Sequence, residues 1–285
     1  MALLDISGLE LEFVARQGVT KVLRGIDLSV ERGQIVGVVG ETGSGKSITG
    51  MSVSRIVPTP PARYTGGGIS FDGIDILGQD EKAMRRLRGN RIGMVFQDPS
   101  ANLNPVLTIR EQMVDVGLHI ASVEPAKLNL NAGVSGAIRK RAALDKAVAM
   151  LERVGVRDAA LRIGSFPHQF SGGMRQRVMI AMALIGRPDL LIADEPTTAL
   201  DVSVQAQVLE LIYGLVKEYN LGVLMITHNM GVVAQLCTHV AVMNSGRIVE
   251  QGDVRSVLKM PSHEYTRGLL ASIPSVHGRK AEPVS

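Results

Sequence analysis

The chain has 285 residues, of which 45% are apolar and only 3% aromatic, with no Trp. Its single cysteine, Cys237, excludes a disulfide framework within the chain and indicates a reducing compartment. The net charge of +4 comes from scattered basic residues and one cluster at 139–141, which we interpret as a solvated helix face, so no nucleic-acid partner is expected. The length fits one large α/β domain, or a main domain with an inserted subdomain.

Alternating apolar and polar residues mark the first part of the chain. The pattern over 3–13 and 21–30 predicts half-exposed antiparallel strands, and residues 69–71 and 74–77 continue it around a hairpin turn. We expect these strands to form a small sheet of their own. The N-terminus lacks a basic start followed by a long apolar run, so no signal peptide is expected.

Residues 34–50 contain a glycine-rich loop between a predicted buried strand, 35–39, and a predicted helix from Lys46 onward. The sequence satisfies the phosphate-loop pattern. Its glycines allow backbone N–H groups to turn inward around phosphates, and the helix N-terminus adds positive potential. Lys46 is expected to reach the outer phosphates, and the Ser47 hydroxyl to bind Mg²⁺. The predicted nucleotide-binding residues are Gly40, Glu41, Thr42, Gly43, Ser44, Gly45, Lys46 and Ser47.

The middle of the chain alternates between short apolar runs and helical stretches. Prolines at 58, 60 and 61 and glycines at 66–68 predict a loop, and residues 91–96 a buried strand ending at Gln97. Residues 108–187 are predicted to be mainly helical, including 142–154 and 174–185, with a loop over 123–135. A strand over 190–193 and a helix over 203–219 follow.

Residues 221–246 contain no Asp, Glu, Lys or Arg and are long enough to span a bilayer. Polar residues interrupt the segment, so we interpret it as strand 222–226, helix 230–236 and strand 240–243, and predict no transmembrane segment. Strands alternating with helices around a phosphate loop predict an α/β fold with a parallel sheet covered on both faces.

Two carboxylates, Asp194 and Glu195, follow the apolar strand 190–193, where α/β sheets usually bind ligands. Two acids at a strand end would by themselves equally mark a capped helix start. Since a phosphate loop precedes them, we expect Asp194 to hold Mg²⁺ together with Ser47, and Glu195 to polarise the attacking water.

These motifs and four further ones resemble the ATP-binding subunit of an ABC transporter. Residues 170–174 (Phe-Ser-Gly-Gly-Met) match the signature sequence and Gln97 matches the Q-loop glutamine. Ala199-Leu200-Asp201 matches the D-loop, and His228 the switch histidine. The resemblance implies a RecA-like core, an antiparallel β subdomain and a helical subdomain inserted over about 98–180. The ATP-binding domain is expected over 1–252, followed by a C-terminal extension over 253–285.

The resemblance also implies that two chains sandwich two ATP molecules. Ser171, Gly172 and Gly173 would then serve the γ-phosphate held by the opposite subunit, and Asp201 would make contacts across the dimer. Without the resemblance, Ser171, Gly172 and Gly173 would be a flexible turn ahead of a helix, and Asp201 would be a helix N-cap.

Two more site residues receive roles from the resemblance. His228 would contact the γ-phosphate and orient the water and Glu195. Gln97 would contact Mg²⁺ or the water and act as a hinge toward a membrane partner. Without the resemblance, they are a capping histidine and a polar strand end.

The chain departs from the family's usual pattern in two places. The family commonly stacks adenine on an aromatic residue upstream of the phosphate loop, but residues 16–23 offer none, and Phe13 is the nearest substitute. Signature position five is Met174 instead of the commoner Gln.

One branch of the family fits in more detail. Residues 96–99 with 103–105, residues 173–178, and the tail His263-Glu264-Tyr265-Thr266 with Pro274 resemble the dipeptide, oligopeptide and nickel importers of bacteria. The cysteine-rich extension that often binds an iron–sulfur cluster in this branch is not expected, because no Cys follows Cys237.

This branch implies an ATPase that energises import of peptides or nickel from the cytoplasmic face of the inner membrane. Its expected partners are a second ATP-binding subunit, identical or related, two transmembrane permease subunits and, indirectly, a solute-binding protein. The alternatives are a soluble ABC ATPase of DNA repair or translation and an exporter subunit. The first is disfavoured because no long heptad run separates Ser47 from Ser171 and the chain holds one cassette.

Overall fold

The computed structural model describes residues 2–16, 18–198 and 200–272. Within these ranges the strands are β1 (Leu4–Ala15), β2 (Gly18–Val30), β3 (Ile35–Val39), β4 (Ala62–Phe71), β5 (Ile74–Asp75), β6 (Ile92–Val95), β7 (Leu190–Asp194), β8 (Gly222–Ile226), β9 (His239–Asn244) and β10 (Arg247–Asp253). The helices are α1 (Lys46–Val53), α2 (Glu81–Leu87), α3 (Pro99–Asn102), α4 (Ile109–Val123), α5 (Gly136–Arg153), α6 (Ala159–Arg162), α7 (Gly172–Leu184), α8 (Val202–Tyr219), α9 (Met230–Leu236), α10 (Val254–Lys259) and α11 (Glu264–Ala271), with 3₁₀ turns η1 (Pro125–Leu128) and η2 (Pro167–Gln169).

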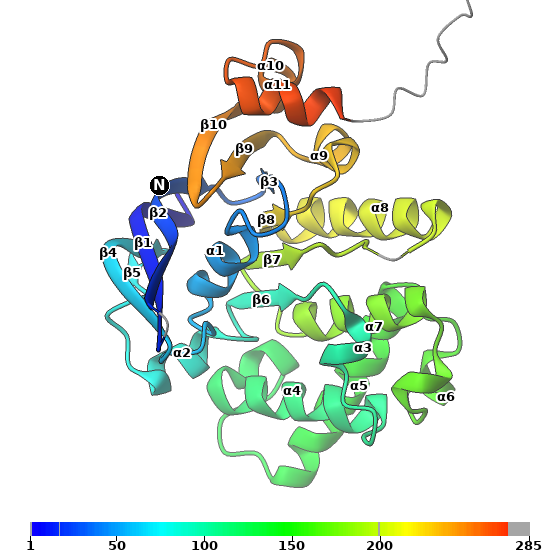
Figure 1. Ribbon diagram of the computed structural model, residues 1–285. Helices are drawn as coiled ribbons and strands as arrows, with labels where there is room; N and C mark the ends of the chain where they lie inside the picture. Colours follow the sequence, from blue (N-terminus) through cyan, green and yellow to red (C-terminus); the bar gives the residue numbers. More distant parts are fainter. Residues whose placement is uncertain (1, 17, 199, 273–285) are drawn as a thin grey trace, which may run out of the picture.

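A six-stranded sheet in the order β10-β9-β3-β8-β7-β6 forms the centre of the molecule (Figure 1). The strands from β9 to β6 run parallel, and β10 returns antiparallel to β9. Successive side chains of a strand point to opposite faces, so Leu190 and Ile192 pack on the α1 side while Leu191 and Ala193 pack on the α8 side. This double burial explains why the strands read as continuous apolar runs, and it confirms the predicted parallel sheet with two covered faces.

A four-stranded antiparallel sheet, β2-β1-β4-β5, lies beside the core (blue and cyan in Figure 1), as the alternating pattern predicted. The predicted loop over 66–68 is wrong, because these glycines lie within β4. They form a bulge: a Cβ on Gly67 would lie 2.2 Å from the Gly8 carbonyl oxygen, so glycine is needed where β1 and β4 approach. The strand predicted to end at residue 77 stops at Asp75.

Helices α3 to α7 form a helical layer at the β6 end of the sheet (green in Figure 1). Its apolar residues belong to the same hydrophobic cluster as the α8 face of the sheet. The predicted loop over 123–135 contains η1, and Lys140 and Arg141 are exposed on α5 while Arg139 is half-buried. The proposed limits of the helical subdomain remain a prediction.

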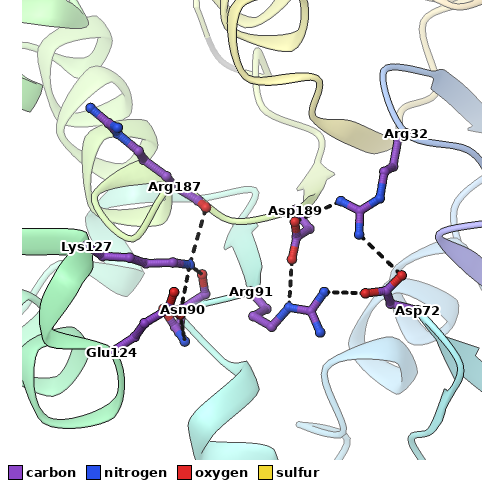
Figure 2. Close-up of polar contacts among 8 residues, drawn as sticks. All are labelled: Arg32, Asp72, Asn90, Arg91, Glu124, Lys127, Arg187 and Asp189. Atoms are coloured by element: carbon purple, nitrogen blue, oxygen red, sulfur yellow. Dashed lines mark hydrogen bonds and ion pairs between the residues drawn. The ribbon is translucent and has the colours of Figure 1, made fainter.

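A ring of four charged residues fastens the antiparallel sheet to the core (Figure 2). Arg32 and Arg91 donate to Asp189 at 2.8 and 2.7 Å, and Arg91 donates to Asp72 at 2.6 Å. Arg32 closes the ring on Asp72 at 3.2 Å. Because Arg32, Arg91 and Asp189 precede β3, β6 and β7, the ring marks the amino ends of the parallel strands, opposite the edge at which the phosphate loop begins.

A neighbouring contact fastens the helical layer to the same edge (Figure 2). The Lys127 amine of η1 donates to the carbonyl of Asn90 at 2.7 Å, and the Asn90 amide donates to Glu124 at 3.1 Å.

Residues 221–246 form β8, α9 and β9, as predicted. Across the part of the chain that the structure describes, helices of the length and apolar character needed to cross a membrane are absent. Ala199 of the D-loop and residues 273–285 of the expected C-terminal extension, Pro274 among them, lie outside the described residues.

Candidate nucleotide-binding site

The carboxyl ends of β3, β6, β7 and β8 bring most of the predicted site residues together, because parallel strands end at the same edge of a sheet. The phosphate loop follows β3, Gln97 follows β6, and His228 follows β8. His228 contacts Glu195, and the phosphate loop, Gln97 and Glu195 border a cavity of about 220 Å³. It is lined by Val22, Thr42, Gly43, Gly45, Lys46, Ser47, Ile48, Gln97 and Glu195.

The phosphate loop has a backbone that requires glycine at two positions. Gly40 has φ +154°, and a Cβ there would lie 2.1 Å from the Met243 carbonyl oxygen. Gly45 has φ +106° and is the N-cap of α1, where no side chain accepts a hydrogen bond from the helix. The N–H groups of the first turn are therefore available to an anion, as expected for a phosphate site.

Lys46 is buried beneath the loop, with 5% of its surface exposed. Its amine donates to the carbonyls of Gly40 and Glu41, both at 2.8 Å. Burial lowers the pKa of this amine, against the opposing influence of Glu195, Asp194 and Glu41. The Lys46 amine is thus held at the loop carbonyls, in the lining of the cavity that a triphosphate would fill.

Ser47 and Asp194 form a direct pair: the Ser47 hydroxyl donates to Asp194 Oδ1 at 3.0 Å. Asp194 is 6% exposed, and burial raises its pKa, helped by the nearby Glu195 charge and opposed by Ser47 and Lys46. Its charge is therefore poorly compensated within the chain. In the described residues no three His, Cys, Asp or Glu side chains form a metal site by themselves. The oxygen donors present fit Mg²⁺, which takes one or two protein ligands together with phosphate oxygens and water.

Glu195 receives three hydrogen bonds within the site. Gln97 Nε2 donates to Oε2 at 2.9 Å, the Thr198 hydroxyl donates to Oε2 at 2.8 Å, and His228 Nδ1 lies 3.0 Å from Oε1. Burial acts to raise the pKa of Glu195, but His228, Thr198 and Lys46 outweigh it and lower the pKa below the ordinary value. Glu195 is therefore ionised at neutral pH.

The backbone of Glu195 is also unusual, with φ +48°. This left-handed conformation is uncommon for residues other than glycine, and it persists here between the end of β7 and the turn that Thr198 N–H closes on the Glu195 carbonyl at 3.1 Å. The turn directs the carboxylate at the cavity instead of along the strand.

The signature residues lie elsewhere in the chain. Ser171 is the N-cap of α7 and accepts from Met174 N–H at 3.4 Å, and Gly172 is the first residue of the helix. Ser171 and Gly173 line a separate cavity of about 290 Å³ with Arg157, Arg162 and Arg177 among its other residues. The predicted helix start is confirmed, but one chain does not bring the signature into the cavity beside the phosphate loop.

Asp201 is the N-cap of α8 and accepts from Val204 N–H at 2.9 Å. The capping role considered for it is therefore present, while its contacts across a dimer stay a prediction. Phe13 is half-buried against the apolar cluster of the antiparallel sheet, and its role in adenine stacking also stays a prediction.

The sequence reasoning missed three residues of this region. Thr198 holds the Glu195 carboxylate, Val22 of β2 lines the cavity, and the Tyr265 hydroxyl accepts from Glu41 N–H at 3.1 Å. Thr198 lies three residues after Glu195, a spacing that fits the turn. Val22 and Tyr265 come from distant parts of the chain, and no local sequence pattern predicts their contacts with the site.

A glycine loop at the end of β3, a lysine beneath it and two carboxylates at the end of β7 define a phosphate-loop ATPase. A family model described as "ABC transporter" matches residues 23–198, and the chain belongs to this family as an ATP-binding, ATP-hydrolysing subunit.

Several curated proteins are similar over nearly the whole chain. A probable peptide ABC transporter ATP-binding protein, y4tR of Sinorhizobium fredii, is 45% identical over 95% of this chain and 77% of its own length. The oligopeptide transport ATP-binding protein OppD of Bacillus subtilis is 42% identical over 99% of this chain and 75% of its own length. An uncharacterised ABC transporter ATP-binding protein of Escherichia coli, YejF, is 46% identical over 96% of this chain, which spans 49% of that relative.

A solved structure described as a dimer of MJ0796, a bacterial ABC transporter cassette, has a TM-score of 0.73 and 25% identity, covering 88% of this chain and 99% of that one. The likeness confirms the predicted cassette fold, in which a mixed α/β core carries an antiparallel sheet and a helical insertion.

Proposed function

We propose that this chain is the ATP-hydrolysing subunit of a bacterial peptide importer. The observation that carries the proposal is the similarity, at 42 to 45% identity over at least 95% of the chain, to relatives named for peptide and oligopeptide transport. Of the peptides and nickel that the sequence left open, these names favour peptides. The proposed location of the chain is the cytoplasmic face of the inner membrane, where it would be a peripheral subunit.

The loop and its lysine bind the substrate ATP in this proposal. Backbone N–H groups from Gly43 to Ser47 surround the phosphates, and Lys46 moves from the loop carbonyls toward the outer phosphate oxygens. Ser47, Asp194 and Gln97 would hold Mg²⁺, which would neutralise charge and orient the phosphates.

Glu195 accepts a hydrogen bond from the attacking water, whose oxygen bonds to the γ-phosphorus as the bond to the bridging oxygen of ADP breaks. Because its pKa is lowered, the Glu195 carboxylate is ionised and can accept this hydrogen bond from the water. His228, Thr198 and Gln97 hold it in place, so that it is oriented before the water arrives.

The site is completed by a second subunit in this proposal. The α7 N-terminus, with Ser171, Gly172 and Gly173, would approach the γ-phosphate bound by the partner, and Asp201 would contact the partner nearby. This accounts for a signature that faces a cavity of its own within one chain. The partner is an identical or related ATP-binding subunit.

The transmembrane subunits would bind at an apolar groove of about 260 Å³ between β6 and the helical layer. Phe96, Leu103, Val116 and Met182 line it, and Gln97 follows Phe96 directly. A protein in this groove would therefore sit one residue from a side chain that holds Glu195. The helical subdomain over about 98–180, the cassette over 1–252 and the C-terminal extension over 253–285 are the proposed units.

Affinity capture of the full chain from detergent-solubilised membranes tests the function. We expect two multi-spanning permease subunits, a second ATP-binding subunit and, by association, a solute-binding protein, identified by mass. Addition of peptides with the binding protein should stimulate ATP hydrolysis by the captured complex, while nickel should not. Capture of a DNA-repair complex, or of ribosomal RNA whose binding persists at high salt, would contradict the proposal. Transport of a solute in the export direction, measured with loaded vesicles, would show that the subunit belongs to an exporter and not to an importer.

A further inference from the structure

The C-terminal helix α11 touches the phosphate loop, a contact that the proposed chemistry does not use. The Tyr265 hydroxyl accepts a hydrogen bond from the Glu41 backbone N–H at 3.1 Å, across 224 residues of sequence. In Figure 1, α10 and α11 lie beside β9 and β10, at the end of the central sheet where β9 separates β10 from β3. A C-terminal segment therefore reaches the second residue of the nucleotide-binding loop.

Glu250 of β10 fixes the start of α11, and hence the position of Tyr265. Its carboxylate accepts from Ser262 N–H at 2.7 Å, from the Ser262 hydroxyl at 2.8 Å and from His263 N–H at 3.1 Å. Burial opposes ionisation of this carboxyl, but the surrounding donors outweigh it and lower the pKa of Glu250 to about 2. His263 then caps α11 by accepting from Tyr265 N–H at 3.1 Å.

The ring of Tyr265 is anchored separately from its hydroxyl. It packs, half-buried, against an apolar cluster that contains Val39, Val242 and Val257. Val39 is the last residue of β3 and directly precedes the phosphate loop. The ring thus packs against the apolar cluster to which the last residue of β3 belongs, and the hydroxyl contacts the loop itself.

The Glu41 residue is held on both of its backbone polar groups. Its N–H is bound by Tyr265, and its carbonyl accepts from the Lys46 amine at 2.8 Å. When Lys46 turns toward phosphate oxygens, the carbonyl keeps the Ser44 N–H, at 3.2 Å within the loop itself, and the Tyr265 hydroxyl continues to hold the residue from outside the loop. Loss of the hydroxyl would leave this half of the loop with more conformational freedom, which nucleotide binding must then remove.

We propose that Tyr265 is a positioning residue for ATP: its hydroxyl holds Glu41 so that the phosphate loop keeps its receptive conformation, and through it the Glu250-anchored C-terminal segment sets nucleotide affinity. The inference rests on the proposed function of the loop and adds to it. Because the contact is made to the loop and not to Glu195, it affects binding of ATP more than the chemical step.

The full chain with Tyr265→Phe tests this, since the substitution removes the hydroxyl and keeps the ring. Loss of one neutral hydrogen bond should raise the Kd for MgATP, measured by titration calorimetry, about 3- to 10-fold, and KM in parallel, with kcat within about 2-fold. The matched control is Tyr213→Phe on α8, where the side chain is 41% exposed. Both variants should unfold thermally at the wild-type temperature without nucleotide.

A double variant tests the anchor. As a single substitution, Glu250→Ala should raise the Kd for MgATP by a similar factor. In the Tyr265→Phe background it should raise the Kd little further, because both changes remove the same support of the loop. An unchanged Kd in Tyr265→Phe, or a loss of kcat at unchanged KM, would overturn the inference while the ATPase assignment stands. A wild-type chain that fails to bind ATP would overturn both.

Discussion

Gln97 and Glu195 are 98 residues apart in the sequence, yet the Gln97 amide donates to the Glu195 carboxylate at 2.9 Å. The contact exists because β6 and β7 are adjacent parallel strands that end at the same edge. Gln97 also directly follows Phe96, which lines the apolar groove proposed for the membrane subunits. The residue that lines the groove, Phe96, and the residue that holds the carboxylate, Gln97, are therefore consecutive, so that a protein bound in the proposed groove would lie one residue from the contact with Glu195.

Replacement of that carboxylate is the first prediction. Glu195→Gln should lower steady ATP hydrolysis by about 10²-fold or more, since an amide cannot accept the proton of the attacking water, while ATP binding stays near wild type. Phosphate release and titration calorimetry measure the two. Glu152→Gln, on the exposed face of α5, is the control and should retain turnover. Unchanged hydrolysis in Glu195→Gln would remove Glu195 from its proposed role.

The second prediction uses two glycines with the same local setting. Gly172 and Gly136 each begin a helix after a serine N-cap, and a Cβ on either would meet no atom of the chain within 4 Å. Alanine at either position should leave the free energy of unfolding equal or raise it by up to about 1 kcal/mol. If a partner's nucleotide approaches Gly172, Gly172→Ala should lower turnover at least about 10-fold, because a methyl group then intrudes on that contact.

Gly136→Ala should turn over ATP as the wild type does. Both variants should bind ATP normally as dilute monomers, and only Gly172→Ala should lose the rise in turnover per chain that accompanies concentration. Equal turnover in the two variants would contradict a site shared between subunits.

The third prediction concerns Mg²⁺ and two serines of α1. The Ser47 hydroxyl donates to Asp194, whereas the Ser52 hydroxyl donates to the Ile48 carbonyl at 2.7 Å within the helix. Ser47→Ala should raise the Mg²⁺ concentration for half-maximal hydrolysis at least about 10-fold, because it removes a metal ligand and leaves Asp194 without its donor. Binding of ATP in a chelator should change little. Ser52→Ala is the control. If both variants reached half-maximal hydrolysis at the same Mg²⁺ concentration, Ser47 would be excluded as a metal ligand.

The sequence predicted the parts of the site whose spacing is local. The phosphate loop, the paired carboxylates and the N-cap serine of α7 each occupy a few consecutive residues, and their backbone requirements can be read from glycine and from strand or helix periodicity. The resemblance assigned Gln97 and His228 to the site of Asp194, and the structure gives the physical reason for their convergence, since parallel strands end at one edge of the sheet.

Contacts between distant segments escaped the sequence reasoning. Tyr265 reaches Glu41 through a C-terminal helix whose docking depends on Glu250, and no pattern near either residue encodes that pairing. The glycines at 66–68 resembled a loop because their neighbour in space, Gly8, lies far away in the chain. Short elements such as α2 and α10 have too few residues for a clear period.

The fourth prediction concerns the charged ring of Figure 2 and acid stability. Burial acts to raise the pKa of Asp189, but hydrogen bonds from Arg32 and Arg91 outweigh it and lower the pKa below the ordinary 3.8. The hydrogen bond from Arg91 likewise lowers the pKa of Asp72. A carboxyl with a lowered folded-state pKa contributes stability above its ordinary pKa, and this stability is lost as pH falls through the lower, folded-state value.

Asp189→Asn should therefore reduce the free energy of unfolding by about 1–3 kcal/mol near neutral pH, because two charge-assisted hydrogen bonds lose their anion. Urea unfolding measures the loss. The difference in unfolding free energy between wild type and variant should narrow as pH falls below 3.8, where the carboxyl of the unfolded wild type takes up a proton, and should level off once pH passes the lower pKa of the folded carboxyl. Arg85→Gln, which breaks the exposed pair with Glu81 at 3.6 Å, should change stability by less than about 0.5 kcal/mol. A gap that stays constant with pH would mean that Asp189 acts by its shape and not by its charge.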